Sequence, residues 1–153
     1  MNAPRQSRAE VEAAIPHRDP FLFVDRIVEE TEDSVTTEWD VPAGADWFRG
    51  HYPGRPILPG VLISEHVFQS AAILVSRRAG GLDTVSAVPV LSRIESARFR
   101  RLVRPGETLR TRVTLEERVG PAWFLTGDVR CAGASVLRIR CALAAAPVPD
   151  EEG

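Results

Sequence analysis

The chain has 153 residues, of which 44% are hydrophobic and 26% charged, enough for one ordinary globular core. We therefore expect a single domain over residues 1–153, with its core at about residues 8–144. The formal net charge of −2 argues against a general nucleic-acid binder, which needs a strongly basic face. All 19 basic residues are arginine, and the absence of lysine excludes Schiff-base chemistry, pyridoxal-phosphate attachment and a P-loop lysine.

No signal for membrane insertion or export stands out. The chain has no apolar run near the roughly 18 residues that a membrane span requires. Its N-terminus, Met1 to Glu10, is polar and lacks the apolar centre of a secretory signal. We expect no membrane association and a cytoplasmic location.

The cysteines and histidines give no metal-binding pattern. Cys131 and Cys141 lie ten positions apart in segments that read as neighbouring strands, so a disulfide is conceivable, but reduced core residues are the favoured interpretation. Neither cysteine has metal-ligand spacing to a histidine, and His17, His51 and His66 are scattered. We expect no metal site.

The N-terminal third predicts a short helix followed by a hairpin. Ser7 and Glu10 fit a capping box for a helix over Arg8–Ala14, which Pro16 would stop. An extended apolar run, Phe21–Val24, follows. The next segments read as two strands, joined by a turn at Glu32 and Asp33: Arg26–Glu30 and Ser34–Trp39.

The middle of the chain predicts a structured loop and then one long helix. Residues Val41–Pro59 are rich in Pro and Gly but carry large side chains to bury, and loops of that length in a compact domain are usually functional. From Val61 to Ala79, apolar residues recur at three- and four-residue offsets, with Gly80 and Gly81 as a C-terminal stop.

The remainder alternates with a period of two, which is typical of strands with short connections. Leu109, Val113 and Leu115 share one face of such a strand. The other expected strands are Thr84–Leu91, Ile94–Phe99, Trp123–Cys131 and Leu137–Leu143, with turns at Val103–Gly106 and Ala132–Gly133. Because the connections are too short for crossovers, we expect antiparallel pairing around the helix, an α+β domain, with Ala144–Gly153 as a frayed, flexible tail.

One constellation in the middle of the chain has the residue types of an acid/base site. His51 and Glu65 lie fourteen positions apart, with two Pro/Gly turns between them. If Pro59 opens the helix, the N–H of Gly60 is among its unpaired donors, and Glu65 and Gln69 are i,i+4 partners on one face. These residues supply a base, an acid and an oxyanion donor. Removal of a proton next to a thioester carbonyl, with loss of a β-hydroxyl, requires that set.

Each of these residues also has a structural interpretation. A single loop histidine such as His51 is more often a surface or hydrogen-bonded residue, and a helical glutamate such as Glu65 is by default solvated. His66 points roughly 100° round the helix from Glu65, and His17 follows a proline in a turn, so both are expected to be structural. Ser64 has no base beside it and reads as part of the helix.

Three motifs, in order, resemble the FabZ-type (3R)-hydroxyacyl-acyl-carrier-protein dehydratases. The resemblance covers roughly residues 10–143. Its motifs are Pro16–Arg26, Gly50–Glu65 with Gln69, and Ala97–Arg101 with Val103–Gly106. It implies a hotdog fold, in which an antiparallel sheet wraps a long central helix, and a dimer as the minimal unit. It implies no cofactor, because the substrate arrives on the phosphopantetheine arm of an acyl carrier protein.

The resemblance also implies roles for three residues. His51 matches the family's catalytic histidine and Glu65 its catalytic carboxylate, while the N–H of Gly60 matches the donor that polarises the thioester carbonyl. The i,i+4 spacing predicts that Gln69 holds the carboxylate in a fixed rotamer. In this family the histidine of one protomer works with the carboxylate of the other, so a monomer has no complete site. Glu65 further favours dehydration alone, because the related FabA-type dehydratase-isomerases carry Asp at that position.

Departures from the family pattern fall beside the expected site. The family usually reads Glu-Ala-Met-Ala-Gln where this chain has Glu65-His66-Val67-Phe68-Gln69, so His66 and Phe68 are bulkier than usual. They are expected to affect the acyl tunnel or to fit an unusual partner protomer. Tyr52 replaces the common Phe and is the only tyrosine.

Partner predictions concern the carrier protein and the oligomer. The basic stretch with Arg98, Arg100, Arg101 and Arg104 is interpreted either as a docking surface for an acidic carrier protein or as an exposed strand face. The expected assembly is a homodimer or a higher oligomer such as a hexamer, or a heterodimer with a related dehydratase.

The leading function is dehydration of (3R)-3-hydroxyacyl carrier-protein thioesters to trans-2-enoyl thioesters in fatty-acid, polyketide or polyene biosynthesis. Two alternatives stay open. A hotdog acyl thioesterase fits the fold, although such enzymes do not normally combine this loop with Glu and Gln on the helix. A partner subunit of a heteromeric dehydratase fits the altered positions 66 and 68.

Overall fold

The computed structural model describes residues 6–78 and 87–148 as two helices, a short 3₁₀ helix and six strands. The helices are α1 (Arg8–Ala14) and α2 (Gly60–Arg78), and the 3₁₀ helix spans Asp46–Arg49. The strands are β1 (Arg26–Glu30), β2 (Ser34–Asp40), β3 (Ala87–Phe99), β4 (Thr108–Val119), β5 (Ala122–Cys131) and β6 (Ala134–Pro147).

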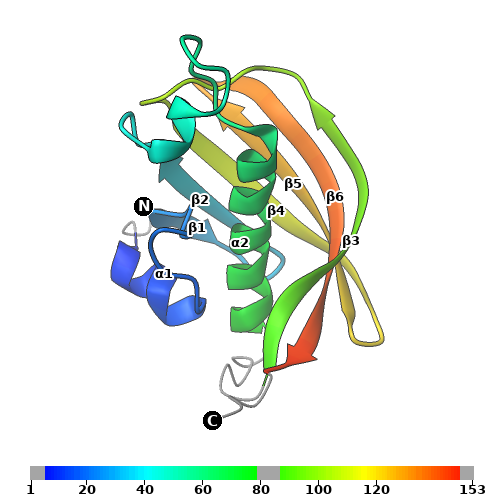
Figure 1. Ribbon diagram of the computed structural model, residues 1–153. Coiled ribbons are helices and arrows are strands. Elements are labelled where there is room, and N and C mark those ends of the chain that lie inside the picture. The colour runs from blue at the N-terminus through cyan, green and yellow to red at the C-terminus, as the bar shows by residue number, and fades with distance from the viewer. Residues whose placement is uncertain (1–5, 79–86, 149–153) are drawn as a thin grey trace.

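All six strands form one antiparallel sheet in the order β1-β2-β4-β5-β6-β3. The sheet curves around α2, which lies against its concave face (Figure 1). Side chains of α2 such as Ile63, Val67 and Ala71 are buried there with strand residues such as Val113 and Ile139. This is the predicted hotdog arrangement, in which the sheet covers the apolar side of the helix.

Several predicted elements match the structure in detail. Helix α1 and strand β1 have the expected bounds, and β1 pairs with β2 as the expected hairpin. The N–H of Ser7 donates to the Glu10 carboxylate at 2.6 Å, as the capping box requires. Helix α2 begins one residue earlier than expected, at Gly60, and the predicted stop at Gly80 and Gly81 lies outside the described residues.

Two predictions about the sheet are wrong. The segments Thr84–Leu91 and Ile94–Phe99 were expected as separate strands, but in the described residues Ala87–Phe99 is continuous. Its pairing with β6 shifts register between Leu91 and Arg93 and again between Ile94 and Ser96, which interrupts the period of two. Residues Ala144–Pro147 are not a frayed tail, because they continue β6 and pair with the start of β3.

Both cysteines are buried and unpaired, as the favoured interpretation has it. Cys131 pairs with Ala134 beside the β5–β6 turn, whereas Cys141 pairs with Leu125, so the two lie far apart along neighbouring strands. Neither helix in the described parts of the chain has the length and apolar character needed to cross a bilayer.

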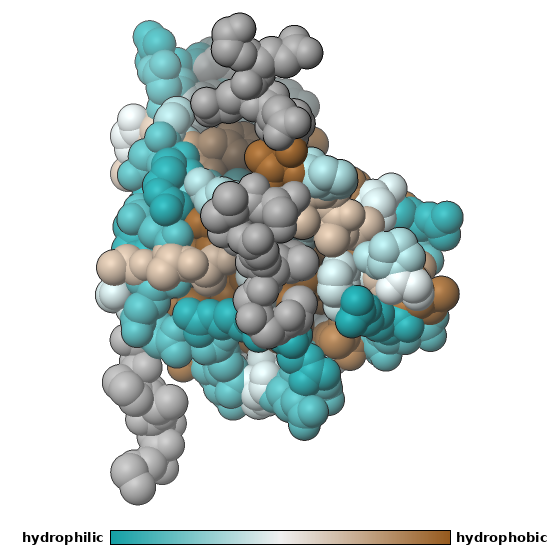
Figure 2. Space-filling model, turned by 90° about the horizontal axis from the view of Figure 1, so that it is seen from below, coloured by the Kyte–Doolittle hydropathy of each residue, from teal (hydrophilic) through white to brown (hydrophobic). Residues whose placement is uncertain are grey.

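The far end of α2 is tied to the hairpin by charged side chains. Arg77 forms an ion pair with Glu30, and Arg78 forms one with Asp33 at 3.1 Å. Seen from this end, much of the surface that is coloured by hydropathy is hydrophilic, with separate hydrophobic patches (Figure 2). The opposite end, where α2 begins, carries the residues of the predicted site.

Candidate active site

Helix α2 holds Glu65 and Gln69 together one turn apart. The Gln69 amide donates to Glu65 Oε1 at 3.1 Å, as the i,i+4 spacing predicts. The same amide is fixed by the main chain before β1, because its oxygen accepts from Phe23 N–H at 2.8 Å and its nitrogen donates to the Phe21 carbonyl at 3.2 Å. Because the Gln69 amide is itself held in place, it fixes the orientation of the Glu65 carboxyl group.

The surroundings of Glu65 favour its protonated form. Its side chain is 23% exposed. Burial raises the pKa of the carboxyl above its ordinary value, and the hydrogen bond from Gln69 acts in the opposite direction with a smaller effect. Glu65 thus has the electrostatics of a general acid, not of a solvated helix face.

His17 lies beside this carboxyl, where the sequence predicted only a structural residue. Its Nε2 is 3.9 Å from Glu65 Oε1, and its side chain is 27% exposed. Burial lowers the pKa of His17, and the positive charge of Arg18 lowers it further. The one sequence signal for this position was the Pro16-His17-Arg18 motif, since periodicity says nothing of how a loop folds onto a helix.

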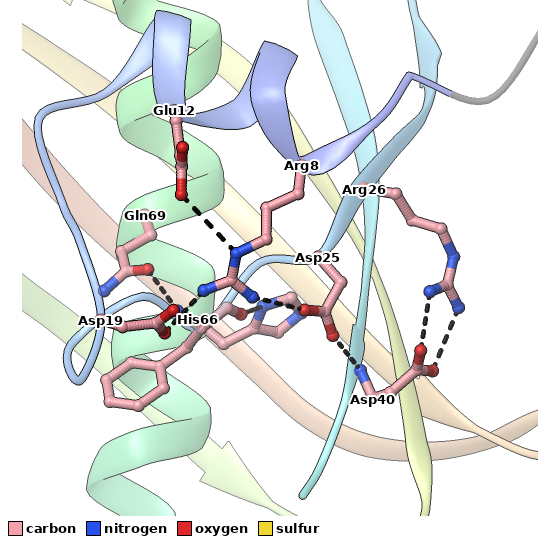
Figure 3. A network of polar contacts seen from close by, with 9 residues as sticks. Arg8, Glu12, Asp19, Asp25, Arg26, Asp40, His66 and Gln69 are labelled. Carbon is pink, nitrogen blue, oxygen red and sulfur yellow. Dashed lines mark hydrogen bonds and ion pairs between the residues drawn. The ribbon is translucent and has the colours of Figure 1, made fainter.

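His66 is a structural residue, as predicted, and it points into the core of its own protomer. The ring is fully buried, packs on Trp39 with centroids 5.7 Å apart, and places Nδ1 2.6 Å from the Phe23 carbonyl. Burial lowers its pKa to about 4, so the ring is neutral and Nδ1–H donates to that carbonyl. Phe23 is therefore held from both sides, by Gln69 and by His66 (Figure 3).

His51 occupies a different part of the molecule, in the loop before α2. Its Nδ1 lies 3.0 Å from the Ile57 carbonyl, and Leu58 N–H ties the loop to the Val103 carbonyl at 2.7 Å. With Nδ1–H donating to Ile57, the lone pair of Nε2 is available as a base. Tyr52 packs edge-on against the ring, at 4.8 Å, and has a φ of 52°, a strained value for a residue with a side chain.

A pocket of about 330 Å³ joins His51 to the start of α2. Gly60, Phe99 and Leu102 are among its lining residues. A Cβ on Gly60 would meet the Phe99 ring at 3.1 Å, so glycine allows the ring to lie against the helix end. As the first residue of α2, Gly60 presents an N–H that has no acceptor within the helix. The structure thus brings together the predicted base and the predicted carbonyl donor.

The predicted acid and base are not joined within one chain. In the described residues, neither a hydrogen bond nor an ion pair links His51 to Glu65, and Glu65 does not line the pocket of His51. We call Glu65, Gln69 and His17 the acid half-site, and His51 and Gly60 the base half-site, after the roles that the sequence predicts for Glu65 and His51.

The predicted arginine surface divides into two parts. Arg101 is paired with Glu107 at 2.7 Å, whereas Arg98 and Arg100 line a hollow of about 560 Å³ on the outer face of the sheet. Arg138 and Arg140, which belong to the predicted strand Leu137–Leu143, also line the hollow. Arg100 lines the His51 pocket too, so the hollow and the pocket adjoin.

Comparisons with known proteins identify the family of the chain. The FabA-like domain family matches residues 15–140. The chain is 41% identical to 3-hydroxyacyl-[acyl-carrier-protein] dehydratase FabZ of Acidiphilium cryptum over 124 residues, 80% of this chain and 74% of that one. It is 38% identical to the FabZ dehydratase of Rickettsia bellii over 125 residues, 81% and 85% of the two chains.

The fold is also that of a solved dehydratase. The dehydratase heterocomplex ApeI:P from Xenorhabdus doucetiae matches with a TM-score of 0.73 and 16% identity, over 92% of this chain and 91% of that chain. At that identity the likeness concerns the fold alone. From the family match and the identity to the two FabZ dehydratases, the chain belongs to the FabA-like family and is a FabZ-like hotdog protein.

Proposed function

We propose that this chain dehydrates (3R)-3-hydroxyacyl thioesters of acyl carrier protein to trans-2-enoyl thioesters in fatty-acid biosynthesis. The observation that carries the proposal is a carboxyl group, Glu65, whose pKa is raised by burial and whose orientation is fixed by Gln69. Two relatives that are about 40% identical are named as dehydratases of such substrates.

The proposed reaction uses both half-sites. The Nε2 lone pair of His51 takes the C2 proton of the substrate, and the Gly60 N–H donates to the thioester oxygen as negative charge develops there. The C2–H electrons form the C2–C3 double bond as the C3–O bond breaks. Glu65 gives its proton to the departing hydroxyl, which leaves as water. The chain then holds an imidazolium at His51 and a carboxylate at Glu65, and a proton must return to Glu65 before the next turnover.

A dimer that places His51 of one protomer beside Glu65 of its partner follows from the separation of the two half-sites. The edge strand β3 supports this proposal, because its residues are exposed on both faces from Val90 onward and include Leu91 and Ile94 at 41% and 50% exposure. Phe99, at the end of this strand, is 48% exposed beside the His51 pocket. An isologous contact along this edge would cover both the unpaired strand and the apolar side chains.

The carrier protein is proposed to dock at the arginine hollow. Arg98 and Arg100 make no ion pair with the described residues, so they supply the positive charge of the hollow next to the His51 pocket. The neighbouring Arg138 and Arg140 are paired with Asp128 and Glu95, and Glu116 also lines the hollow. An acidic carrier bound there would have its arm directed at the pocket. Arg101 is less suited, because Glu107 neutralises it. A cytoplasmic location, shared with such a carrier, belongs to the same proposal.

The direct test is catalysis by the purified chain. With an enoyl carrier-protein substrate and water, the chain should form the 3-hydroxyacyl thioester, and His51→Ala and Glu65→Gln should each lower turnover by at least about a hundredfold. Release of free acid would instead identify a thioesterase. Inactivity that a second, different chain restores would identify a subunit of a heteromeric dehydratase.

Mixing the two inactive variants tests whether a site spans two protomers. In a mixed dimer of His51→Ala and Glu65→Gln chains, one site would lose both groups and the other would keep both. Since about half of randomly paired dimers are mixed and each has one intact site of two, activity should recover to about a quarter of wild type. Absence of recovery in demonstrably mixed dimers would place both residues of a site in one chain.

A charge reversal tests the docking surface. Arg98→Glu with Arg100→Glu should raise KM for a carrier-linked substrate at least about tenfold and leave KM for a small pantetheine thioester nearly unchanged. Arg101→Glu is the matched control, with a smaller effect on KM. Equal effects on both substrates would count against docking at the hollow.

A further inference from the structure

The loop that carries His17 is held firmly against α1 and α2. The Arg18 guanidinium donates to the carbonyls of Ile15 and Glu12 at 2.9 and 3.0 Å, and Asp19 accepts from Arg8 at 2.6 Å. Arg8 bridges this loop to Asp25, which anchors the loop at its other end (Figure 3). These hydrogen bonds therefore fix the loop in the position in which His17 faces Glu65.

Two nitrogen atoms face the same oxygen of Glu65. Gln69 donates to Oε1 at 3.1 Å, and His17 Nε2 lies 3.9 Å from that same atom. His17 Nδ1 is buried and has no hydrogen-bond partner among the described residues. A buried N–H without an acceptor is costlier than a buried lone pair, so the favoured tautomer of His17 carries its proton on Nε2, towards Glu65.

We propose that His17 is a positioning residue for Glu65: its neutral ring, together with the Gln69 amide, favours Oε1 as the carbonyl oxygen and so holds the acidic proton on Oε2. An oxygen that faces two N–H groups is a poor place for a proton, whereas Oε2 is left to donate to the substrate hydroxyl. This inference rests on the proposed dehydration and concerns how its acid is kept ready. The position of His17 in the sequence, in a loop far from Glu65, does not by itself suggest this role.

The neutral state of His17 is needed for this role. A positive charge within about 4 Å of Glu65 would stabilise the carboxylate and remove the acid. In the described residues, the charged or titratable groups that act on the ring are Arg18 and Glu65. Arg18 disfavours a second positive charge, and burial does the same, which is the direction in which the pKa of His17 is moved. Asp19, further along the loop, is paired with Arg8 of α1, which also pairs with Glu12 and Asp25.

Three substitutions of His17 test the proposal. His17→Gln keeps an N–H near the position of Nε2, His17→Leu removes it, and His17→Arg adds a fixed charge. The contact between His17 Nε2 and Glu65 Oε1, at 3.9 Å, is longer than a hydrogen bond. Relative to wild type, His17→Leu should therefore lower kcat by only about threefold with little change in KM, and His17→Gln should restore most of that loss. In His17→Arg, the alkaline limb of the kcat–pH profile should move to lower pH by at least about one unit.

The outcomes separate this inference from the proposed function. If Glu65→Gln abolishes turnover but Gln and Leu at position 17 behave alike and Arg leaves the alkaline limb unmoved, His17 has no positioning role and the dehydration proposal stands. If Glu65→Gln is nearly as active as wild type, the proposed function itself fails. Thermal unfolding of all three variants checks that each is folded, and the pH limb of a folded His17→Arg chain decides the question even if its kcat is low.

Discussion

The acid half-site and the base half-site differ in how much of their environment one chain supplies. Glu65 is enclosed within its own protomer, by Gln69, by His17 and by a segment before β1 that the buried His66 fixes. His51 instead lies in a loop whose tip is exposed, beside Phe99 and Leu102, which are 48% and 66% exposed.

The difference follows from the chemistry of each group. A general acid that works near neutral pH needs a raised pKa, and burial in a rigid core supplies it. A histidine base needs a fixed tautomer, and the Ile57 carbonyl provides it for His51. The chain therefore completes the environment of its acid by itself and leaves the base half-site to be covered from outside.

Of the variants considered, a charge on the edge strand β3 should have the largest effect on assembly and activity. Ile94 is 50% exposed in β3, and a two-fold contact would bring two copies of Ile94→Glu into the same interface. We expect Ile94→Glu chains to be monomeric by sedimentation and, where monomeric, at least about a hundredfold less active, since the two half-sites of a proposed complete site then lie in separate molecules. The fold of each protomer should persist.

Val119→Glu is the matched control for this variant. Val119 is 55% exposed but lies at the end of β4 beside the β4–β5 turn, three places from β3 in the sheet order. It should leave both mass and activity nearly unchanged. A monomeric Ile94→Glu chain with wild-type turnover would show that one chain holds a complete site.

The buried His66, next to Glu65 in α2, predicts a pH-dependent stability. The pKa of His66 is about 4 in the folded chain against 6.5 when free, so as pH falls the unfolded chain binds a proton first. The folded state should lose stability between pH 6.5 and 4, by about 3 kcal/mol in total for this group. The loss is absent above pH 6.5, because both states are then neutral.

Urea unfolding at closely spaced pH values measures this loss. His17 acts in the same direction, since its pKa is also lowered, so the comparison uses His66→Gln in both wild-type and His17→Gln backgrounds. Substitution of His66 should flatten the slope between pH 6.5 and 5, above the range in which most carboxylates titrate. An unchanged slope in both backgrounds would contradict a neutral, buried His66.

Sequence periodicity predicted the frame that positions these half-sites. The bounds of α1 and β1, the long helix and the α+β class were predicted, because capping residues and alternation are local signals. The hotdog arrangement was implied by the family resemblance alone. The Glu65–Gln69 pair was predicted for the same reason, since i,i+4 spacing fixes it within one helix. Strand β3 was divided in two because its register shifts break the alternation that identifies a strand.

The contacts that enclose Glu65 were not predicted, because they join segments distant in sequence. Phe23 N–H reaches Gln69 across 46 positions, and the His17 loop reaches Glu65 across a similar span. A sequence shows which residues a helix presents on one face, but not which loop packs on that face. His17 therefore read as an ordinary turn residue until the fold placed it.

Replacing a glycine by alanine beside each half-site gives the prediction with the smallest expected effect. The two positions are Gly127, beside the acid half-site, and Gly60, in the base half-site. A Cβ on Gly127 of β5 would lie 2.4 Å from Cγ1 of Val67, on the helix that carries Glu65, and a β-branched side chain in a close-packed core cannot move away easily. We expect Gly127→Ala to lower the free energy of unfolding by about 1–3 kcal/mol.

Gly60→Ala makes the equivalent contact in the base half-site, at 3.1 Å from the Phe99 ring. Phe99 is half-exposed and can shift, and alanine favours a helical position over glycine by about 0.5–1 kcal/mol, so the net change in stability should stay within about 1 kcal/mol. Chemical denaturation of the two variants at one pH compares them directly.

Adding Val67→Ala should relieve the overlap in Gly127→Ala, so that the double variant is more stable than the sum of the single losses implies. Equal losses at Gly60 and Gly127 would mean that the base half-site is packed as rigidly as the acid half-site, and that its exposed aromatic ring is held by more than the described contacts.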